Sequence, residues 1–523
     1  MNRTLGIRFS PEHLALASIV AALIVAVGVG FGSDPLATGI AAGIAALLVL
    51  VTFRGSTLVD WVRLRRHTRG KIVPATSHTR DKAGVVWDGQ NATVWMEVTP
   101  EEPYLVTSVS HSGVIDREPL PVEKITSLLR QFDIVLSRVD VISHGVRTAL
   151  SGHRPSLATL VVAGATPWTL HGRTYLSVVL DLTASLAAVD ARAKKGNIPL
   201  GLDRTVLVAA SRIRLACQQA GVRARLLNRA QVEQLTAEIV SQAGPALDDQ
   251  HWTGSGSDRT VQVNSLTTAG PGWDEKAHRE WMTTPAHRTI EVLSLSETGH
   301  EPRASYIVTF VQRGSSLVSL SRLRSFGLRP LGGQQRQAAT RFIPLATEEE
   351  VTVPLHDPFE KGSPVMYPGG LGVYTGTSRE LGQVFLRIDT GRAQPLWLIG
   401  PDVLAEQYVL RLSAALMTVD VRITGEKAEQ WERFISRLGT PLITFNARET
   451  ADVVVVGPEQ ASDYRGRNQT VIVTSPTVPA ITPRYSVVAT GDHLVATMGT
   501  RRIEVPWTIP NVEAEFLSPE LLS

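Results

Sequence analysis

The chain has 523 residues, of which 43% are hydrophobic and 19% are charged. This apolar content excludes a disordered chain, and a net charge of +3 is too small for this length to favour nucleic acid as a partner. The single cysteine, Cys217, excludes an internal disulfide and a Cys-x-x-Cys metal or redox site.

Two uncharged apolar stretches, residues 14–32 and 36–53, follow an N-terminal tail of residues 1–13. Each is near the minimum of about 17 to 20 residues that crosses a hydrocarbon core, and each is apolar on every face. The link between them is only a few residues long, so the two helices must be antiparallel neighbours. Because no small-x-small cleavage site separates the stretches, they predict a transmembrane hairpin and not a cleaved signal peptide.

Basic residues set the expected orientation of this hairpin. Arg3 and Arg8 precede the first stretch, and the link carries only Asp34. A basic juxtamembrane segment, residues 54–72, follows the second stretch. The positive-inside rule therefore predicts a multi-pass protein of the cell inner membrane, with both termini and most of the chain in the cytosol.

Small residues four positions apart mark one face of each predicted span. Ala17 and Ala21 form such a pair in the first span, and Gly39 and Gly43 form one in the second. Small side chains let helix backbones approach closely. The pairs predict transmembrane packing, either between the two spans or against another subunit.

The juxtamembrane segment combines one aromatic residue with several arginines. Trp61 would lie at the level of the lipid headgroups, and each arginine would gain about 1 kcal/mol against anionic lipid. The basic residues in question are Arg54, Arg63, Arg65, Arg66 and Arg69. A cluster that serves only to orient the hairpin explains the same residues.

The following residues, 73–245, are predicted to form a first cytosolic α/β lobe. A β-hairpin is expected over 84–98, with Trp87 and Trp95 packed across it, and a helix is expected over 121–132. An apolar strand at 174–182, a helix over 203–220 and a strand from 222 have the order of a β-α-β unit.

Residues 246–287 are rich in turn formers and are predicted to be a loop-rich boundary between two lobes. A second α/β lobe is expected over 288–523. Its predicted strands include 288–294, 305–312 and 317–323, and its predicted helices are 401–417 and 427–438. The fold class is therefore α/β: a two-helix transmembrane hairpin followed by a large, mixed cytosolic region.

The sequence contains no recognisable catalytic motif. There is no P-loop to hold phosphate and magnesium, and Ser255 lacks the spacing of a nucleophile elbow. Residues 369–372 are expected to form a turn between strands, and Asp248 and Asp249 a solvated pair. Cys217 is expected to be a core thiol. We therefore predict no catalytic, cofactor-binding or metal-binding residues.

Several segments resemble the EccE family, a membrane component of mycobacterial type VII (ESX) secretion systems. They are residues 6–10, the paired spans, residues 51–55, the hairpin 84–98, and residues 369–376 with the later 395–416. The resemblance implies a peripheral subunit of the inner-membrane complex, with EccB, EccC and EccD as partners and EccD in contact with the spans. It also implies a glycosyltransferase-like soluble fold without enzymatic activity, and ATP hydrolysis by EccC.

Three hypotheses about function follow. The first is a structural subunit that supports the assembly or stability of the secretion complex. The second is a membrane-tethered, glycosyltransferase-like enzyme, and the third is a membrane-anchored module that binds a cytosolic partner. The anchor, the absence of catalytic motifs and the family resemblance favour the first.

Overall fold

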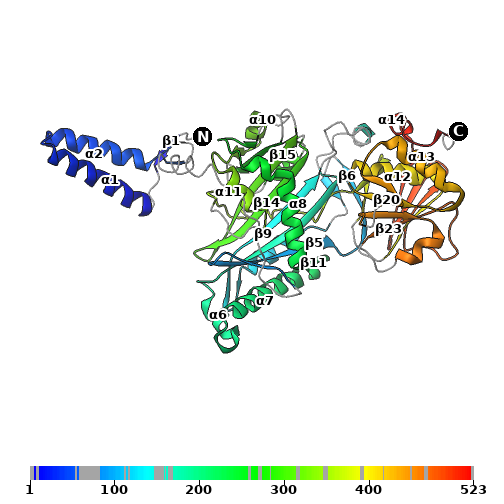
Figure 1. Ribbon diagram of the computed structural model, residues 1–523, viewed down its shortest axis with the longest axis horizontal. Coiled ribbons are helices and arrows are strands. Elements are labelled where there is room, and N and C mark those ends of the chain that lie inside the picture. The colour runs from blue at the N-terminus through cyan, green and yellow to red at the C-terminus, as the bar shows by residue number, and fades with distance from the viewer. Residues whose placement is uncertain are drawn as a thin grey trace.

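The computed structural model consists of three parts that follow one another along its longest axis (Figure 1). They are an N-terminal helical hairpin, a central lobe and a C-terminal lobe. The described residues are 5–7, 11–53, 56–57, 83–110, 113–115, 118–146, 158, 161–162, 169–256, 261–268, 274–282, 284, 286–313, 319–344, 351–388, 394–415, 417–447, 450–464 and 469–519.

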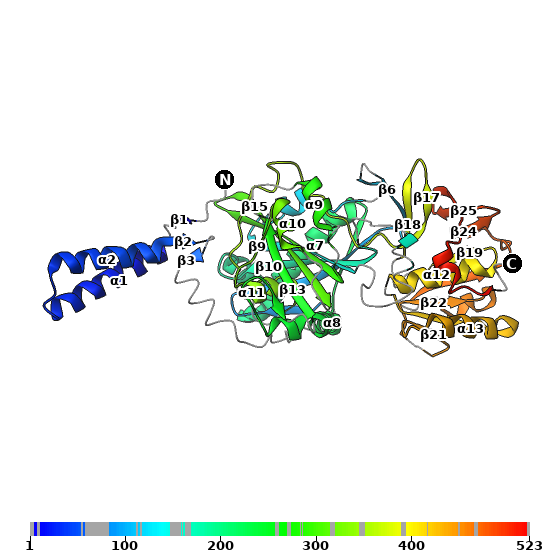
Figure 2. The same cartoon turned by 90° about the horizontal axis from the view of Figure 1, so that it is seen from above.

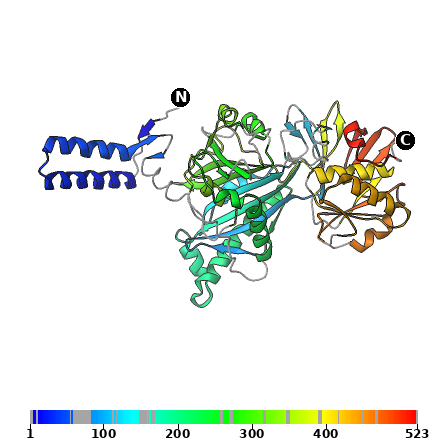
Figure 3. The same ribbon diagram turned by 45° about the horizontal axis from the view of Figure 1, so that its top comes forward.

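The hairpin consists of α1 (Pro11–Gly30) and α2 (Pro35–Leu50). Asp34 caps α2 by accepting a hydrogen bond of 3.1 Å from the amide of Leu36, and Pro35 suits the first helical position. A small antiparallel sheet closes the base of the hairpin, as Figure 3 shows beside the helices. Its strands are β1 (Leu5–Ile7), β2 (Val51–Phe53) and β3 (Ser56–Thr57).

This sheet changes the predicted limits of both spans. The tail 1–13 contains β1 and the first residues of α1, and the second predicted span, 36–53, loses its last three residues to β2. Val51 and Thr52 are β-branched, which favours an extended backbone, and β1 supplies the pairing partner. A continuous apolar stretch cannot reveal this end, because its hydropathy does not change at Leu50.

An antiparallel sheet of eleven strands forms the central lobe, with β11-β5-β10-β9-β14-β15-β13-β12 as its main path. The strands are β4 (Val85–Trp87), β5 (Asn91–Pro100), β8 (Arg130–Gln131), β9 (Ile134–Val146), β10 (His171–Asp181), β11 (Val222–Leu226), β12 (Ser255–Gly256), β13 (Val261–Thr268), β14 (Arg288–Thr298), β15 (Glu301–Arg313) and β16 (Leu328–Pro330). The helices are α4 (Val122–Ser127), α6 (Leu186–Arg192), α7 (Ile198–Gln219), α8 (Arg229–Leu247), α9 (Glu275–Met282), α10 (Leu320–Ser325) and α11 (Gln335–Thr340), with a short 3-10 helix at Lys194–Gly196.

Helices cover both faces of this sheet (Figures 1 and 2). On one face Met96 and Leu176 pack with Val206 of α7. On the other face Trp95 and Tyr175 pack with α8 and α11. Because successive strand residues point to opposite faces and both faces are covered, the central strands read as continuous apolar runs.

The predicted β-α-β unit is present in a split form. Strands β10 and β11 are joined through α7, and both pair antiparallel with β5. They are therefore parallel to each other with β5 inserted between them. The expected helix over 203–220 begins earlier, at Ile198, where Asn197 caps it.

The predicted lobe boundary at 246–287 lies within the central sheet, so the structure differs from that prediction. This segment contains β12, β13 and α9, and β14 pairs directly with β9. Strand β13 is rich in polar residues and yet buried, because the neighbouring strand β15 provides hydrogen-bond partners for its side chains. Ser265 Oγ lies 2.9 Å from Thr309 Oγ1, and Thr267 donates to the Tyr306 carbonyl at 2.8 Å.

The C-terminal lobe is built on a sheet of eight strands in the order β21-β20-β22-β23-β19-β24-β25-β26. The strands from β21 to β24 are parallel, and β25 and β26 are antiparallel. The bounds are β19 (Leu396–Ile399), β20 (Val419–Arg422), β21 (Ile443–Phe445), β22 (Val453–Val456), β23 (Thr470–Ser475), β24 (Tyr485–Thr490), β25 (His493–Met498) and β26 (Arg501–Pro506). The helices are α12 (Asp402–Ala414), α13 (Ala428–Leu438) and α14 (Asn511–Ala514), with 3-10 helices at Gly425–Lys427 and Pro458–Tyr464.

Two strands that follow the central lobe's β5 in the chain belong to a sheet of the C-terminal lobe and so join the two lobes. Strands β6 (Tyr104–Ser110) and β7 (Gly113–Ile115) follow β5 in the chain, but they form a sheet with β17 (Val373–Ser378) and β18 (Gly382–Ile388). This sheet packs in the hydrophobic core of the C-terminal lobe. The lobes are therefore not the contiguous segments 73–245 and 288–523 that the sequence predicts.

Buried hydrogen bonds connect residues near the C-terminus with α12. Glu513 of α14 accepts two hydrogen bonds of 2.8 Å from Arg411, and both side chains are buried. Glu406 accepts hydrogen bonds from the amide and hydroxyl of Ser518. A bidentate pair of this kind satisfies two buried charges together.

Other helix and strand limits also differ from the prediction. The helix expected over 121–132 ends at Ser127, and the strand expected over 317–323 is replaced from Leu320 by α10. The expected helices at 401–417 and 427–438 correspond to α12 and α13.

Candidate functional site

The hairpin buries a narrow strip of small residues between its helices. Ala17 of α1 and Thr38 and Ala42 of α2 are buried, and Ala21 is half-buried. A Cβ added at Gly28 would overlap the side chain of Thr38. Ala17 and Ala21 therefore lie on the side of α1 that packs within the hairpin.

Gly39 and Gly43 lie on a different face of α2. Both are exposed, and a Cβ added at either would meet no described atom within 4 Å. The four residues predicted to pack in the membrane thus divide into an inner pair and an outer pair. The outer pair leaves the backbone of α2 open to close approach.

Large apolar side chains cover the outside of the hairpin. Eleven of them are at least 41% exposed: Leu14, Ile19, Leu23, Val25, Val27, Val29, Phe31, Leu36, Ile40, Ile44 and Leu47. Among the helices that the structure describes, none combines the length and hydropathy needed to cross a membrane. The juxtamembrane residues Arg54, Trp61, Arg63, Arg65, Arg66 and Arg69 lie outside the described residues.

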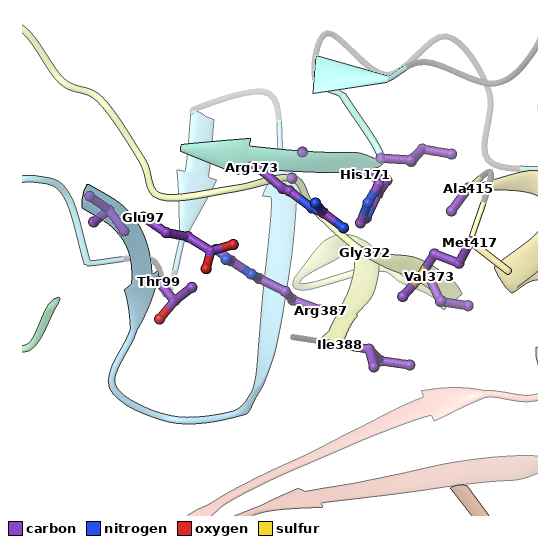
Figure 4. A pocket seen from close by; sticks show the side chains of 14 residues that line it. Glu97, Thr99, His171, Arg173, Gly372, Val373, Arg387, Ile388, Ala415 and Met417 are labelled. Carbon is purple, nitrogen blue, oxygen red and sulfur yellow. The ribbon is translucent and has the colours of Figure 1, made fainter. Parts of the chain in front are cut away.

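A second candidate site is a cavity of about 50 Å³ at the junction of the two lobes (Figure 4). Glu97 from β5, His171 and Arg173 from β10, and Arg387 from β18 converge on it. Met417, just before β20, closes it from the C-terminal lobe. The central sheet, the sheet of β18 and the segment before β20 therefore contribute side chains to one small space.

Charged groups connect the lobes at this cavity. Arg173 lies 3.7 Å from Glu238 of α8 and 3.7 Å from Asp452, which precedes β22. Asp452 is itself held by the amide and hydroxyl of Thr418, at 2.9 and 2.7 Å. Burial and the charge of Arg173 lower the pKa of His171 to about 4. His171 is therefore a neutral group among the charges at neutral pH.

Close backbone packing explains the glycines of residues 369–372. The amides of Leu371 and Gly372 donate to the carbonyls of Thr169 and Leu170, at 3.0 and 2.7 Å. A Cβ at Gly370 would overlap the Leu170 carbonyl. This segment brings two backbones together at the edge of the cavity, and the amides of Gly369, Leu371 and Gly372 have protein acceptors.

The cavity is small compared with binding sites for metabolites. Pockets that enclose drug-sized ligands have volumes of about 300 to 1,000 Å³, whereas one water needs about 10 to 15 Å³. The junction cavity therefore has room for a few waters and not for a nucleotide sugar. Within the described residues, no group of three His, Cys, Asp or Glu side chains is placed to hold a metal ion.

The remaining sequence candidates occupy structural positions. Cys217 is buried in α7, and burial raises the pKa of its thiol to about 12. Asp248 ends α8, and the side chain of Asp249 is exposed. Ser255 is buried in β12 and pairs with β13.

The prediction that Trp87 and Trp95 pack across the hairpin is wrong. Trp87 lies opposite Ala92, so Trp95 points to the other face of the sheet. There it packs edge-on against Tyr175, with ring centroids 6.4 Å apart. The hairpin itself, β4 with β5, is confirmed.

The junction residues His171, Arg173 and Arg387 were not predicted from the sequence. Each lies in or beside an ordinary strand pattern, and no local motif marks them. The one available signal was a basic residue within an apolar strand, because a buried charge in such a place usually has a partner.

Comparison with known proteins bears on the same part of the chain. Residues 169–265, from the strand that carries His171 and Arg173 to β13, match a family model described as "Putative type VII ESX secretion system translocon, EccE". No curated protein matches the chain. The resemblance predicted from the sequence is thus confirmed over residues 169–265, which are similar to the EccE family.

Proposed function

We propose that the chain is a structural subunit of the inner-membrane type VII secretion complex and that α1 and α2 anchor it in the bilayer. The observation that carries this proposal is the apolar outer surface of the hairpin. A monomeric protein rarely exposes so large an apolar surface to water. The matched family is that of a secretion translocon component, which provides the complex for such an anchor.

The proposed topology places both termini and the two lobes in the cytosol. Its support is the distribution of basic residues around the spans. A cysteine introduced at Ser33, in the link between α1 and α2, should react with a membrane-impermeant maleimide in intact spheroplasts. A cysteine at the exposed Ser462 in the C-terminal lobe should react only after lysis. Labelling of Ser462→Cys in intact spheroplasts would exclude this topology.

Gly39 and Gly43 are the residues that we propose contact EccD, with EccB and EccC as further partners in the complex. Both glycines face away from α1 with open space around them. Small residues let transmembrane helices approach closely, and we expect the loss of this packing to weaken the contact about tenfold, which corresponds to about 1.4 kcal/mol. The basic segment around Trp61 would add contacts with anionic lipid.

The test replaces both glycines with leucine in the full chain. Gly39→Leu with Gly43→Leu should leave the packing of α1 on α2 unchanged, because a Cβ at either position meets no described atom within 4 Å. A mild-detergent pull-down should then recover about tenfold less EccD. Gly30→Leu is the matched control, since a Cβ at Gly30 also meets no described atom within 4 Å. Equal recovery of EccD with all variants would contradict the proposed contact.

We further propose that the soluble region has no catalytic role. The parallel sheet of the C-terminal lobe, with α12 and α13, is the part that supports the glycosyltransferase-like fold implied by the resemblance. A fold of this kind does not imply an activity. The small volume of the junction cavity supports the same conclusion. Binding of a nucleotide sugar to the purified chain, measured by calorimetry, would contradict it.

A further inference from the structure

The turn between β8 and β9 places an aromatic residue in a backbone conformation that favours glycine. Gln131 pairs with Ile134, so Phe132 and Asp133 form a two-residue hairpin turn. Phe132 has a φ of 60°. Two-residue turns with positive φ at the first position prefer glycine, because a Cβ is unfavourable there.

The side chain of Phe132 is also held in solvent. It is 90% exposed, more than any other large hydrophobic side chain among the described residues. Neither burial nor backbone preference therefore explains a phenylalanine at this position. Strained backbone positions that the fold does not need are found preferentially at functional sites.

A guanidinium group and a second exposed apolar side chain lie near Phe132. The guanidinium of Arg212 lies 5.1 Å from the centre of the Phe132 ring, and it donates to the Gln131 carbonyl at 3.3 Å. Leu215, three residues further along α7, is 54% exposed. We call Phe132, Arg212 and Leu215 the Phe132 patch. It combines two exposed apolar side chains with a cation whose position is fixed.

The surroundings of the patch are basic. Helix α7 carries Arg204, Arg212 and Arg214 but a single acidic residue, Asp203. The acidic residue of the turn, Asp133, is paired with Arg192 at 2.6 Å. The excess of positive charge on α7 would steer an acidic surface toward the patch.

We propose that the Phe132 patch docks an acidic segment of another subunit of the secretion complex. The proposal rests on the proposed function for the identity of that complex. Phe132 would fill an apolar pocket of the partner, and a carboxylate of the partner would pair with Arg212. Aromatic and arginine side chains of this kind dominate the binding energy of many interfaces.

A protein partner fits the patch better than a lipid surface. The carboxylate of Asp133 is adjacent to Phe132 and half-exposed. Membrane surfaces are bound through broad apolar faces, whereas the patch exposes only the side chains of Phe132 and Leu215. A protein pocket needs only the ring and one complementary charge.

The test uses photocrosslinking in the full chain in membranes that contain the whole secretion system. p-Benzoylphenylalanine is introduced at Leu215, and a control chain carries it at Ile481, which is 85% exposed in the C-terminal lobe. We expect the Leu215 probe to react with another subunit, within a segment rich in Asp and Glu. Phe132→Gly should lower this yield about tenfold or more, and Phe132→Tyr should preserve it.

Phe132→Gly also separates a docking role from a structural role. Glycine suits the positive φ, so the melting temperature of the solubilised chain should stay the same or rise by a few degrees. A clear fall in melting temperature would mean that the ring stabilises the fold, and it would overturn the proposal.

Three other results would overturn the proposal. They are adducts with lipid, adducts with a second copy of this chain, and no adduct although the chain co-purifies with the complex. The last result would leave the proposed function intact. If the chain does not co-purify, the proposed function fails. The docking proposal, which names another subunit of that complex as the partner, then fails as well.

Discussion

Several polar side chains of this protein are buried deeply enough to change their chemistry. His144 of β9 lies in the core of the central lobe, edge-on to Tyr175 and Phe342. Burial, together with the charges of Arg288 and Arg173, lowers the pKa of His144 to about 3. The ring is therefore neutral in the folded chain throughout the physiological range.

This burial predicts a stability that falls in acid. The unfolded chain takes up a proton at His144 below pH 6.5, whereas the folded chain does so only near pH 3. The contribution to stability is thus complete above pH 6.5 and is lost as the pH falls toward 3. In that window the free energy of unfolding should fall by about 1.4 kcal/mol per pH unit for this residue.

Urea unfolding of the solubilised chain at a series of pH values measures this slope. His144→Asn has no titrating ring, so its slope between about pH 5 and 6 should be smaller than that of the wild type by about 1.4 kcal/mol per pH unit. His171 contributes in the same direction down to about pH 4 and remains in both proteins. Equal slopes would show that His144 is not shielded from protons.

At the scale of elements, glycines decide where separate strands can meet. Gly372 precedes β17 with a φ of 98°, and a Cβ there would overlap the carbonyl of Leu386 in β18. Gly89, in the turn between β4 and β5, has a φ of 99°, but a Cβ there meets no described atom within 4 Å. The two positions share a backbone conformation and differ in the space around it.

Alanine at these two positions should therefore have different effects. Gly89→Ala should lower the free energy of unfolding by about 1 kcal/mol, since only the backbone preference is lost. Gly372→Ala should cost at least about 2 kcal/mol more, because the backbone of β18 must also move. Thermal melting of the two variants beside the wild type measures the difference. Similar melting temperatures would mean that the segment before β17 can move away without cost.

At the scale of the whole molecule, charged contacts join the two lobes, and so do β6 and β7, which follow β5 of the central lobe but pair in a sheet of the C-terminal lobe. Arg173 spans the junction by reaching Glu238 in the central lobe and Asp452 in the C-terminal lobe. The segment that matches the EccE family begins at the same strand. The relative position of the lobes thus depends on residues within the matched segment.

Removal of the Arg173 side-chain charge should loosen this junction without unfolding either lobe. Arg173→Met should speed hydrogen exchange at the amides of Thr418 and Asp452, which are hydrogen-bonded to each other's side chains beside the contact. Arg229→Met, which removes an exposed pair within α8, is the control and should not affect these amides. If hydrogen exchange at these amides is unchanged in Arg173→Met, the pairing of β6 with β18 holds the lobes together without this charged contact.

Much of the local structure follows from the sequence. The apolar runs at β10, β22 and β23 predict buried strands, and the caps and periodicity predict α7, α12 and α13 to within a few residues. The apolar neighbours of Cys217 in the sequence also predict its position in the core, which is confirmed. These features depend on neighbours within a few positions, which a sequence displays directly.

The arrangement of the lobes was decided by the tertiary structure alone. Strand β13 is polar because Ser265 and Thr267 find partners across the sheet, so its composition resembles a loop. Strand β6 follows β5 by only a few residues and yet pairs with β18. The junction of Arg173 with Asp452 joins residues far apart in the chain. Long-range pairing of this kind leaves no local pattern, since the residues that satisfy each strand or charge lie elsewhere in the sequence.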